Sequence, residues 1–330
     1  DEETSLYTNN KVSPLGILED KFLLKENDIL FARTGASTGK TYLYDKKDGK
    51  LYYAGFLIKA HIKDNYIGKF IFEQTKLNKY YSWVRITSMR SGQPGINSLE
   101  YGNYKFAITN IFEQQKIANF FTLIDKKINL QTQKVELLKR YKKGLLQNLK
   151  SNSKDWKEFR IKDLFNITRG QVIPKNSLRD LSDKEYKYPV YSSQTSNYGI
   201  LGYDKIYDFD GQYLTWTTDG ANAGKVFYRN GKFRCTNVCG LLYSSQNVAY
   251  INLLTADLLN YETPKYVSYV GNPKLMNNVM SNIKIKLPSL KIQSKISNIF
   301  IIFNKKIYIE NQKLEKLNNL KRSLLHQMFI

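Results

Sequence analysis

The chain has 330 residues, and its 51 Lys and Arg residues outnumber 29 acidic ones, which gives a formal net charge of +22. Such an excess favours a polyanionic partner, most often nucleic acid, over the alternative of a basic but inert surface. Two cysteines and two histidines exclude a disulfide framework and a four-ligand zinc site, so we expect no metal and no other cofactor. No apolar run is long enough to span a membrane and the first residues lack signal-peptide features, which predicts a cytoplasmic protein without a membrane partner.

Residues 1–109 consist of short apolar and aromatic runs separated by Gly, Asp and Asn, a pattern typical of a strand-rich domain. The stretch 65–83 interrupts these runs with a pattern that predicts one helix.

A much longer helix is predicted at 113–149. This stretch has no Pro, and its apolar residues are spaced alternately by four and three, as in Ile117, Phe121, Ile124 and Ile128. Such spacing is a heptad seam, and a helix of this length spans about 55 Å at ~1.5 Å per residue. A usual globular domain has no room for it, so we expect a helical partner.

The remaining chain follows the same plan. Residues 151–156 are short and polar, as a linker is, and a second strand-rich domain follows with a predicted helix at 249–263. Its strand-like run RCTNVCGLLY carries Cys235 and Cys239 on one face, and we interpret both as small core residues. The second long helix is predicted at 292–328. We therefore divide the chain into a first domain (1–109), a central helix (110–150), a second domain (151–288) and a C-terminal helix (289–330).

The two halves repeat each other. EQQKIANFF returns 179 residues later as IQSKISNIF, and Gly92-Gln93-Pro94 returns as Gly271-Asn272-Pro273 at the same offset. DILFARTGASTGK corresponds to YLTWTTDGANAGK at an offset of 185. We therefore predict an α+β fold in which two tandem domains are separated by two long helices, packed as an antiparallel coiled coil with pseudo-twofold symmetry. The counterpart of residues 156–175 would precede Asp1, so we expect the chain to begin inside its first domain.

The segment GASTGKT at 35–41 is similar to a phosphate-binding loop. However, its glycines enclose three residues where that loop needs four, and the second copy, GANAGKV, lacks the hydroxyl that binds magnesium. A hairpin that carries Lys40 or Lys225 towards a DNA phosphate accounts for both copies, and a plain hairpin with solvated lysines is the alternative. Methyltransferase motifs such as Asn-Pro-Pro-Tyr are absent too, so we expect no catalytic residues.

Basic, amide and hydroxyl side chains gather in Gly- and Ser-rich loops of both copies. Arg suits guanine, and Asn or Gln suits adenine, in bidentate contacts with base edges. The alternative for any one of them is a phosphate contact or a plain surface position. The candidate DNA-binding residues, including the two loop lysines, are Arg33, Thr34, Lys40, Arg85, Arg90, Gln93, Arg169, Gln194, Asn222, Lys225, Asn272, Lys274 and Asn277.

Polar residues interrupt the heptad seams at equivalent places, Gln131 and Lys142 in the first helix and Glu310 and Lys321 in the second. Polar groups in a seam are costly unless they meet partners. Antiparallel pairing in one register brings Glu310 to Lys142 and Gln131 to Lys321, whereas parallel pairing sets Lys142 against Lys321. We predict the antiparallel register; snorkelling of these side chains to solvent is the alternative.

This tandem architecture, with the strings TGASTGK, SGQPGIN, EQQKIA and LKRSLLHQMF, resembles the specificity subunit of type I restriction-modification systems. One departure is Thr109, where the second copy has Pro288. The resemblance implies that each domain recognises one half of a split double-stranded DNA target and that the helices fix the spacing. It also implies a non-catalytic subunit that recruits two modification subunits and, through them, restriction subunits. The alternative function is a helical assembly protein whose strand-rich domains bind other proteins.

Overall fold

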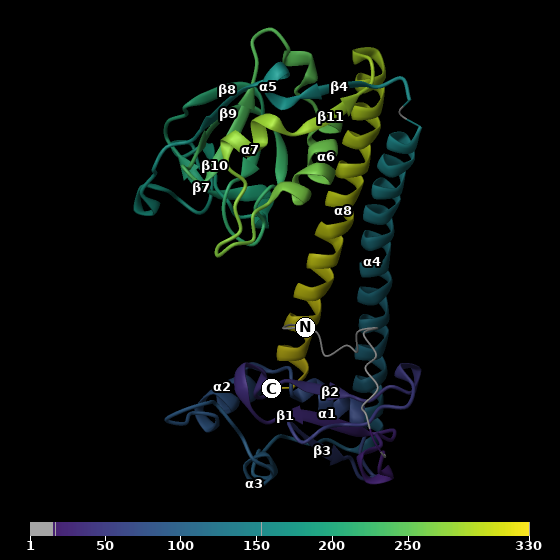
Figure 1. The fold of residues 1–330 in the computed structure, drawn as a ribbon. Helices are drawn as coiled ribbons and strands as arrows, with labels where there is room; N and C mark the ends of the chain where they lie inside the picture. Colours follow the sequence, from purple (N-terminus) through teal and green to yellow (C-terminus); the bar gives the residue numbers. More distant parts are fainter. Residues whose placement is uncertain (1–15, 17, 153, 330) are drawn as a thin grey trace. The chain divides into compact units, whose positions relative to one another are not determined.

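The computed structural model describes residue 16, residues 18–152 and residues 154–329. The chain forms two compact units: Asp1–Lys134 with Glu310–Ile330, and Val135–Ile309. The two long helices are α4 (Ile111–Ser151) and α8 (Leu290–Met328) (Figure 1). Each unit thus combines a strand-rich part with a segment of both helices. This division differs from the one drawn on the sequence, which sets the helices apart from the domains.

A three-stranded antiparallel sheet forms the centre of the first unit. Its strands are β1 (Asp28–Ala32), β2 (Thr41–Leu43) and β3 (Leu57–His61), in the order β2-β1-β3. The central strand β1 has the sequence DILFA and is buried at every residue except Phe31, which is half-buried. Short 3-10 turns lie at Asp20–Phe22, Gly35–Ser37 and Lys46–Asp48.

The single helix expected at 65–83 is in fact two helices, α1 (Gly68–Gln74) and α2 (Asn78–Thr87). Thr75 ends the first helix, because both its backbone N–H (3.1 Å) and its hydroxyl (2.7 Å) donate to the Phe72 carbonyl. Such local side-chain bonds compete with the regular helical pattern. Apolar periodicity continues across both helices and therefore does not reveal the break. A short helix α3 (Ser98–Gly102) follows, and Asn97 and Glu100 form its capping box.

The core of the first unit lies where β1 and α1 meet the long helices. Ile29 of β1 and Phe121 of α4 are fully buried, and Phe70 of α1 and Leu325 of α8 join the same cluster. Burying apolar area contributes roughly 25 cal/mol per Å². The heptad residues of the helices therefore stabilise the domain as well as the helix pair.

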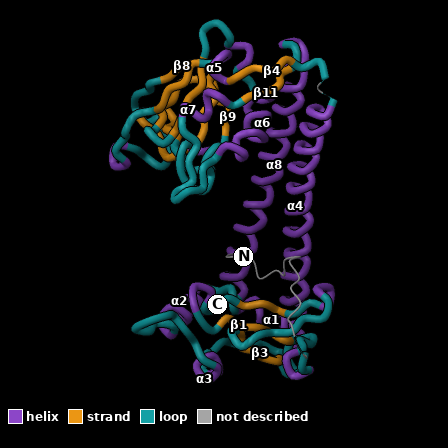
Figure 2. The backbone as a smooth tube through the Cα atoms, in the orientation of Figure 1, coloured by secondary structure: helices purple, strands orange, loops and turns teal. Residues whose placement is uncertain are grey.

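The second unit contains a six-stranded sheet, in the order β5-β10-β8-β9-β6-β7, and a two-stranded sheet that pairs β11 with β4. Neighbouring strands are antiparallel except β6 and β9, which are parallel. Figure 2 shows these strands in orange. The strands are β4 (Lys157–Arg160), β5 (Asn166–Arg169), β6 (Tyr188–Tyr191), β7 (Ile200–Asp204), β8 (Phe209–Thr217), β9 (Val226–Cys235), β10 (Cys239–Tyr243) and β11 (Lys284–Leu287).

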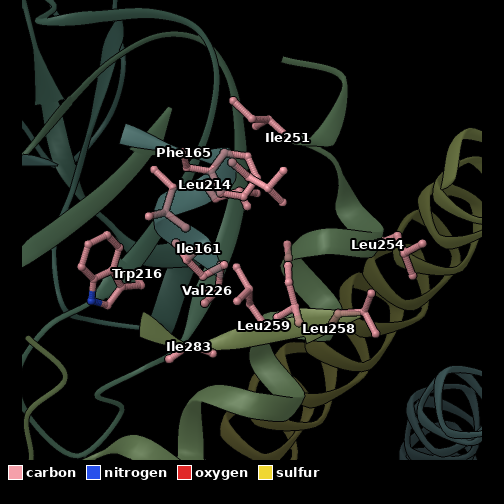
Figure 3. Close-up of a cluster of buried hydrophobic side chains, with 14 of the residues drawn as sticks. Ile161, Phe165, Leu214, Trp216, Val226, Ile251, Leu254, Leu258, Leu259 and Ile283 are labelled. Atoms are coloured by element: carbon pink, nitrogen blue, oxygen red, sulfur yellow. The ribbon is translucent and has the colours of Figure 1, made fainter. Parts of the chain in front are cut away.

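Three helices complete the second unit: α5 (Ile161–Leu164), α6 (Leu253–Glu262) and α7 (Asn277–Asn282). Leu258 and Leu259 of α6 share one core cluster with Trp216 of β8 (Figure 3). The helix expected at 249–263 is α6, preceded by a 3-10 turn at Val248–Tyr250. Other 3-10 turns lie at Lys175–Ser177, Ser196–Gly199 and Thr263–Tyr266.

Cys235 ends β9 and Cys239 begins β10. Both are buried free thiols in a small core cluster, with their sulfur atoms 3.4 Å apart. The interpretation of both residues as small core residues is confirmed. The run RCTNVCGLLY is not one strand face, however, because a turn separates the two strands.

The long helices run antiparallel within each unit, as expected. In the first unit Gln131 of α4 contacts Glu310 of α8 and Asp125 contacts Lys321, so residue numbers rise along one helix as they fall along the other. In the second unit Lys142 of α4 contacts Asn304 of α8.

The predicted register of these helices is wrong. Gln131 donates to the Glu310 backbone carbonyl (2.8 Å) and carboxylate (2.7 Å) instead of meeting Lys321. Lys142 donates to Asn304 (2.9 Å) instead of meeting Glu310, and Lys321 donates to Asp125 (2.6 Å). The physical reason is that carboxylates of the strand-rich parts also attract these lysines: Lys142 forms an ion pair with Asp257 of α6, and Lys321 with Glu73 of α1.

Candidate nucleic-acid interface

Two loops far apart in sequence lie against each other in the first unit. The Gly35 N–H donates to the Pro94 carbonyl (2.9 Å), and the Ile96 N–H donates to the Arg33 carbonyl (2.8 Å). The Thr38 hydroxyl adds a bond to the Pro94 carbonyl at 3.2 Å. We call residues 33–40 and 91–96 the first frame. It unites the two strings, TGASTGK and SGQPGIN, that the sequence shows only separately.

The second unit builds the same arrangement from the equivalent residues. The Gly220 N–H donates to the Pro273 carbonyl (2.9 Å), and the Leu275 N–H donates to the Thr218 carbonyl (2.9 Å). We call residues 218–225 and 270–275 the second frame. Both copies of the repeat thus hold a Gly-rich hairpin loop and a Gly-x-Pro loop together with the same two backbone hydrogen bonds.

Each Gly-rich loop is a hairpin turn between strands and not a phosphate-binding loop that leads into a helix. The Ala32 N–H donates to the Lys40 carbonyl (2.8 Å), and the Thr217 N–H donates to the Lys225 carbonyl (3.0 Å). These bonds close the β1–β2 and β8–β9 hairpins. The hairpin interpretation of both GxxxGK segments is therefore confirmed.

The glycine that precedes each lysine is required by the backbone. Gly39 has φ +86°, and a Cβ there would lie 2.4 Å from Val84 Cγ1; Gly224 has φ +85°, and a Cβ there would lie 3.1 Å from Val267 Cγ2. Residues other than glycine rarely adopt this left-handed backbone conformation. The same requirement in both copies explains why the strings are alike.

The candidate residues of the first unit gather around the first frame. Arg33, Thr34 and Gln93 belong to it and are exposed. Arg90, one residue before the frame, is exposed and forms an ion pair with Glu100. Lys40 is half-buried where the hairpin closes, and Arg85 is exposed on the last turn of α2.

The second unit brings two of its candidates into direct contact. Arg169 Nε of β5 donates to the Asn277 side chain at 2.8 Å. Lys274 faces Asp219 within the second frame, with the ammonium nitrogen 3.9 Å from the carboxylate. Both Asn222 and Asn272 are exposed in the frame loops.

Two candidates of the second unit have partners that indicate structural roles. The Gln194 side chain donates to the Ile200 carbonyl within its own loop. Desolvation lowers the pKa of Lys225, an effect that Asp257 opposes and Lys142 reinforces. The residue as a whole is exposed. Assignment of the thirteen residues to DNA contacts stays a prediction.

Comparison with known proteins shows the family. The model of the type I restriction modification DNA specificity domain matches residues 3–140 and again residues 153–319. The chain belongs to this family. It is a type I DNA specificity protein with two such domains, one for each copy of the repeat.

Relatives and a solved structure agree with the assignment. A Mycoplasma pneumoniae protein named as the N-terminus of a type I specificity subunit is 45% identical over 148 residues, which are 44% of this chain and 77% of that protein. The specificity subunit of the type I restriction enzyme MpnII, from the same organism, is 43% identical over 148 residues, which are 44% of this chain and 43% of that protein. The chain thus matches less than half the length of the MpnII subunit. The crystal structure of a type I S subunit from M. genitalium is similar in fold, with a TM-score of 0.62, 17% identity, and coverage of 94% of this chain and 85% of that one.

The sequence did not reveal which carboxylates form ion pairs with Lys142 and Lys321, the lysines in the heptad seams of this specificity protein. In the first unit Glu73 is fully buried and forms ion pairs with Lys69 (2.5 Å) and Lys321 (3.2 Å). Burial would raise the pKa of Asp125, but Lys69 and Lys321 outweigh that effect and lower it. Desolvation lowers the pKa of the neighbouring Lys76 to about 8. An acidic residue inside the apolar stretch FIFEQ was the available signal for Glu73.

The second unit has the corresponding ion pair between Asp257 and Lys142, at 2.6 Å. Burial raises the pKa of Asp257, against the opposing effects of Lys142 and Lys225. In each specificity domain, therefore, a lysine from the long helix of the other sequence copy neutralises a buried carboxylate. These ion pairs link each domain to the long helix of the other copy.

Within the parts of the chain that the structure describes, no cluster of three or more His, Cys, Asp or Glu residues is arranged to hold a metal ion. Across the same residues, no helix combines the length and apolar character needed to cross a membrane. The segment DKEYK at 183–187 is exposed except for the half-buried Tyr186, and the Asp183 carboxylate accepts hydrogen bonds from the Glu185 and Tyr186 backbone N–H groups.

Proposed function

We propose that the chain reads an asymmetric, bipartite double-stranded DNA target as the non-catalytic specificity subunit of a type I restriction-modification complex in the cytoplasm. The main support for this proposal is that the same backbone frame occurs twice, once in each unit, with different exposed side chains. The first frame presents Arg33, Thr34 and Gln93, and the second presents Asn222, Asn272 and Lys274. A common frame with different hydrogen-bonding groups suits two readers of different base sequences.

The charge of the chain supports the same proposal. An excess of 22 positive charges favours binding to the phosphate backbone, which positions a protein on a duplex without specifying the bases. Exposed Arg33 lies within the first frame, exposed Arg85 lies on the last turn of α2 in the same unit, and Lys274 lies within the second frame. Phosphate contacts would orient each domain, and the frame loops would read base edges.

The long helices are the proposed site for two modification subunits, which would bring the restriction subunits. Large apolar side chains remain exposed on them within each unit, including Phe112 (80%) and Leu123 (67%) in the first and Ile302 (67%) in the second. Exposed apolar side chains of this size on a long helix are available to pack against a partner protein. The repeat supplies a similar helix in each copy, which suits two identical partners.

An exchange of one domain tests the function. Residues 158–288 would be replaced by the corresponding domain of another specificity subunit, and the methylated sites would be mapped in cells that carry the complete system. We expect one half of the target to change and the other half to stay the same. A change in both halves would show that the domains do not read DNA independently.

A salt titration separates this function from the alternative of a helical assembly protein. Affinity for DNA through phosphate contacts falls by orders of magnitude between about 50 and 200 mM salt when 6–10 such contacts are made. An apolar protein interface responds little. Incubation of the chain alone with DNA and labelled S-adenosylmethionine completes the test, because methyl transfer to DNA would contradict a non-catalytic subunit.

A further inference from the structure

The Gly-x-Pro loop of the second unit ends in an exposed apolar tip. Val270 is 92% exposed and Tyr269 is 68% exposed. Below them Ser268 and Lys274 exchange two backbone hydrogen bonds of 2.9 Å, and Gly271 turns the chain with φ +72°. The result is a closed hairpin tip, seen in Figure 1 as the narrow yellow-green loop that leads into α7.

This tip is held firmly by the second frame. Pro273 accepts the hydrogen bond from Gly220, and the fully buried Leu275 is bonded through its N–H to Thr218 and through its carbonyl to the Trp216 indole N–H at 3.0 Å. A side chain on such a base is pre-organised, so little conformational entropy is lost when it makes a contact. The exposed tip therefore meets the conditions for specific recognition.

The two copies carry different chemistry at the tip. At the offset of 179 residues, Tyr269 and Val270 correspond to Arg90 and Ser91. The loop of the first unit also projects, between α2 and α3 in Figure 1. Arg90 and Ser91 form hydrogen bonds with bases or phosphates readily, whereas the Val270 side chain has no hydrogen-bonding group. The frame is constant and its tip varies, which is expected of an element that distinguishes two half-sites.

Cationic groups adjoin the apolar tip. Lys274 closes the hairpin, and the Arg169 guanidinium lies 3.3 Å from the sulfur of Met276, which follows the frame. A duplex attracted by these cations can contact the exposed Val270 side chain. The one apolar feature of a base edge in the major groove is the C5-methyl group of thymine. An aliphatic side chain can pack against that methyl group. It cannot satisfy the hydrogen-bonding atoms of the base edge, because it has no hydrogen-bonding group.

We infer that Val270 contacts the methyl group of a thymine in the major groove and thereby specifies that base in the half-site of the second domain. The inference rests on the proposed function. It assigns the tip of the Gly-x-Pro loop as a specificity element and names the chemical group that it recognises.

The test replaces thymine by deoxyuridine, which removes only the methyl group. Duplexes would be enriched from a randomised pool on the full chain bound to its modification subunits, and each thymine of the enriched target would then be replaced singly. We expect one replacement in the second half-site to weaken binding about fourfold, the effect of one buried methyl group. Val270→Ser should weaken binding to the thymine duplex by a similar factor and abolish the difference between thymine and deoxyuridine.

Leu181→Ser serves as the matched control, because Leu181 is 81% exposed in the same unit but lies outside the frame. It should keep the fourfold difference. Failure to enrich any duplex would contradict the proposed function itself. Three results would overturn the inference while the proposed function stands. They are an enriched target whose second half-site lacks thymine, a series of deoxyuridine replacements in which none weakens binding, and a Val270→Ser variant that still binds the thymine duplex more tightly than the deoxyuridine duplex. If the tip instead inserted between base pairs, no single deoxyuridine replacement would weaken binding, and the inference would be overturned.

Discussion

Gln131 and Glu310 occupy the same position in the two copies of the repeat, and they hydrogen-bond to each other. The Gln131 amide donates to the Glu310 carboxylate at 2.7 Å, and the carboxylate also pairs with Lys134 and Lys313, which are themselves equivalent positions, each at 3.1 Å. The Glu310 side chain is only 6% exposed. A single carboxylate thus receives hydrogen bonds from three side chains of both helices, and these bonds fix the register of α4 and α8 in the first unit.

The Glu310 interactions should make this helix pairing sensitive to acid. Hydrogen bonds from Gln131, Lys134 and Lys313 lower the pKa of Glu310 to about 2, from an ordinary value near 4.5. A depressed pKa stabilises the folded state above the ordinary value, and this stabilisation is lost as the pH falls from about 4.5 to 2. Thermal unfolding of the wild type and Glu310→Gln should therefore differ above pH 5 and converge near pH 2. The exposed Glu136→Gln provides the control, and a constant difference across the whole range would contradict the prediction.

Removal of the Lys321 charge should destabilise the first unit. In Lys321→Met the buried Glu73 and its neighbour Asp125 each lose one ion pair, while the ion pair of each with Lys69 remains. We expect a loss of about 2 kcal/mol in the free energy of unfolding, less than the ~3–5 kcal/mol of a fully buried pair because Asp125 is partly exposed to water. Urea denaturation measures it, with Lys316→Met on the exposed face of α8 as the control. Adding Glu73→Gln and Asp125→Asn should recover stability; no recovery would show that the lysine acts through packing alone.

Two glycines should respond to alanine in opposite directions. Gly39→Ala places a side chain at φ +86° and within 2.4 Å of Val84, and should cost about 2–4 kcal/mol. Gly144→Ala lies inside α4 with nothing within 4 Å of the new Cβ, and should stabilise by about 1 kcal/mol through helix propensity. The melting temperature should fall for Gly39→Ala and rise for Gly144→Ala, relative to the wild type. A neutral Gly39→Ala would show that the first frame tolerates a different hairpin turn.

Lengthening both helices together should lengthen the DNA spacer. One heptad inserted after Gln133 and one after Gln312, at equivalent places in the two copies, adds about 10 Å to each helix and keeps the seam in phase. We expect the unspecified spacer between half-sites to grow by about three base pairs, at ~3.4 Å each, with the half-sites unchanged. Mapping of methylated sites measures this. Seven residues inserted after Asn152, beyond the end of α4, should leave the spacer as it was; an unchanged spacer in the paired insertion would show that the helices do not set the distance.

The sequence by itself determined the elements whose signals are local. Heptad spacing predicted helices at 113–149 and 292–328, and the structure has α4 at Ile111–Ser151 and α8 at Leu290–Met328. The constant offset established the repeat, and the number of residues between the glycines excluded a phosphate-binding loop at 35–41. Each of these features depends on periodicity or on spacing within a few turns of chain, which physical rules relate directly to backbone geometry.

Only the tertiary structure decided what depends on partners far along the chain. The sequence suggests that Lys142 and Lys321 pair with polar residues of the opposite seam, but in the structure they pair with Asp257 and Glu73 on other elements. These ion pairs, together with the hydrogen bonds to Glu310, determine the register. The frames also depend on residues far apart in the chain. The hydrogen bond from the Gly35 N–H to the Pro94 carbonyl joins two residues whose proximity no periodic pattern in the sequence predicts. Electrostatic and backbone hydrogen-bond partners are chosen by proximity in space, and for residues distant in sequence that proximity is fixed by the packed fold.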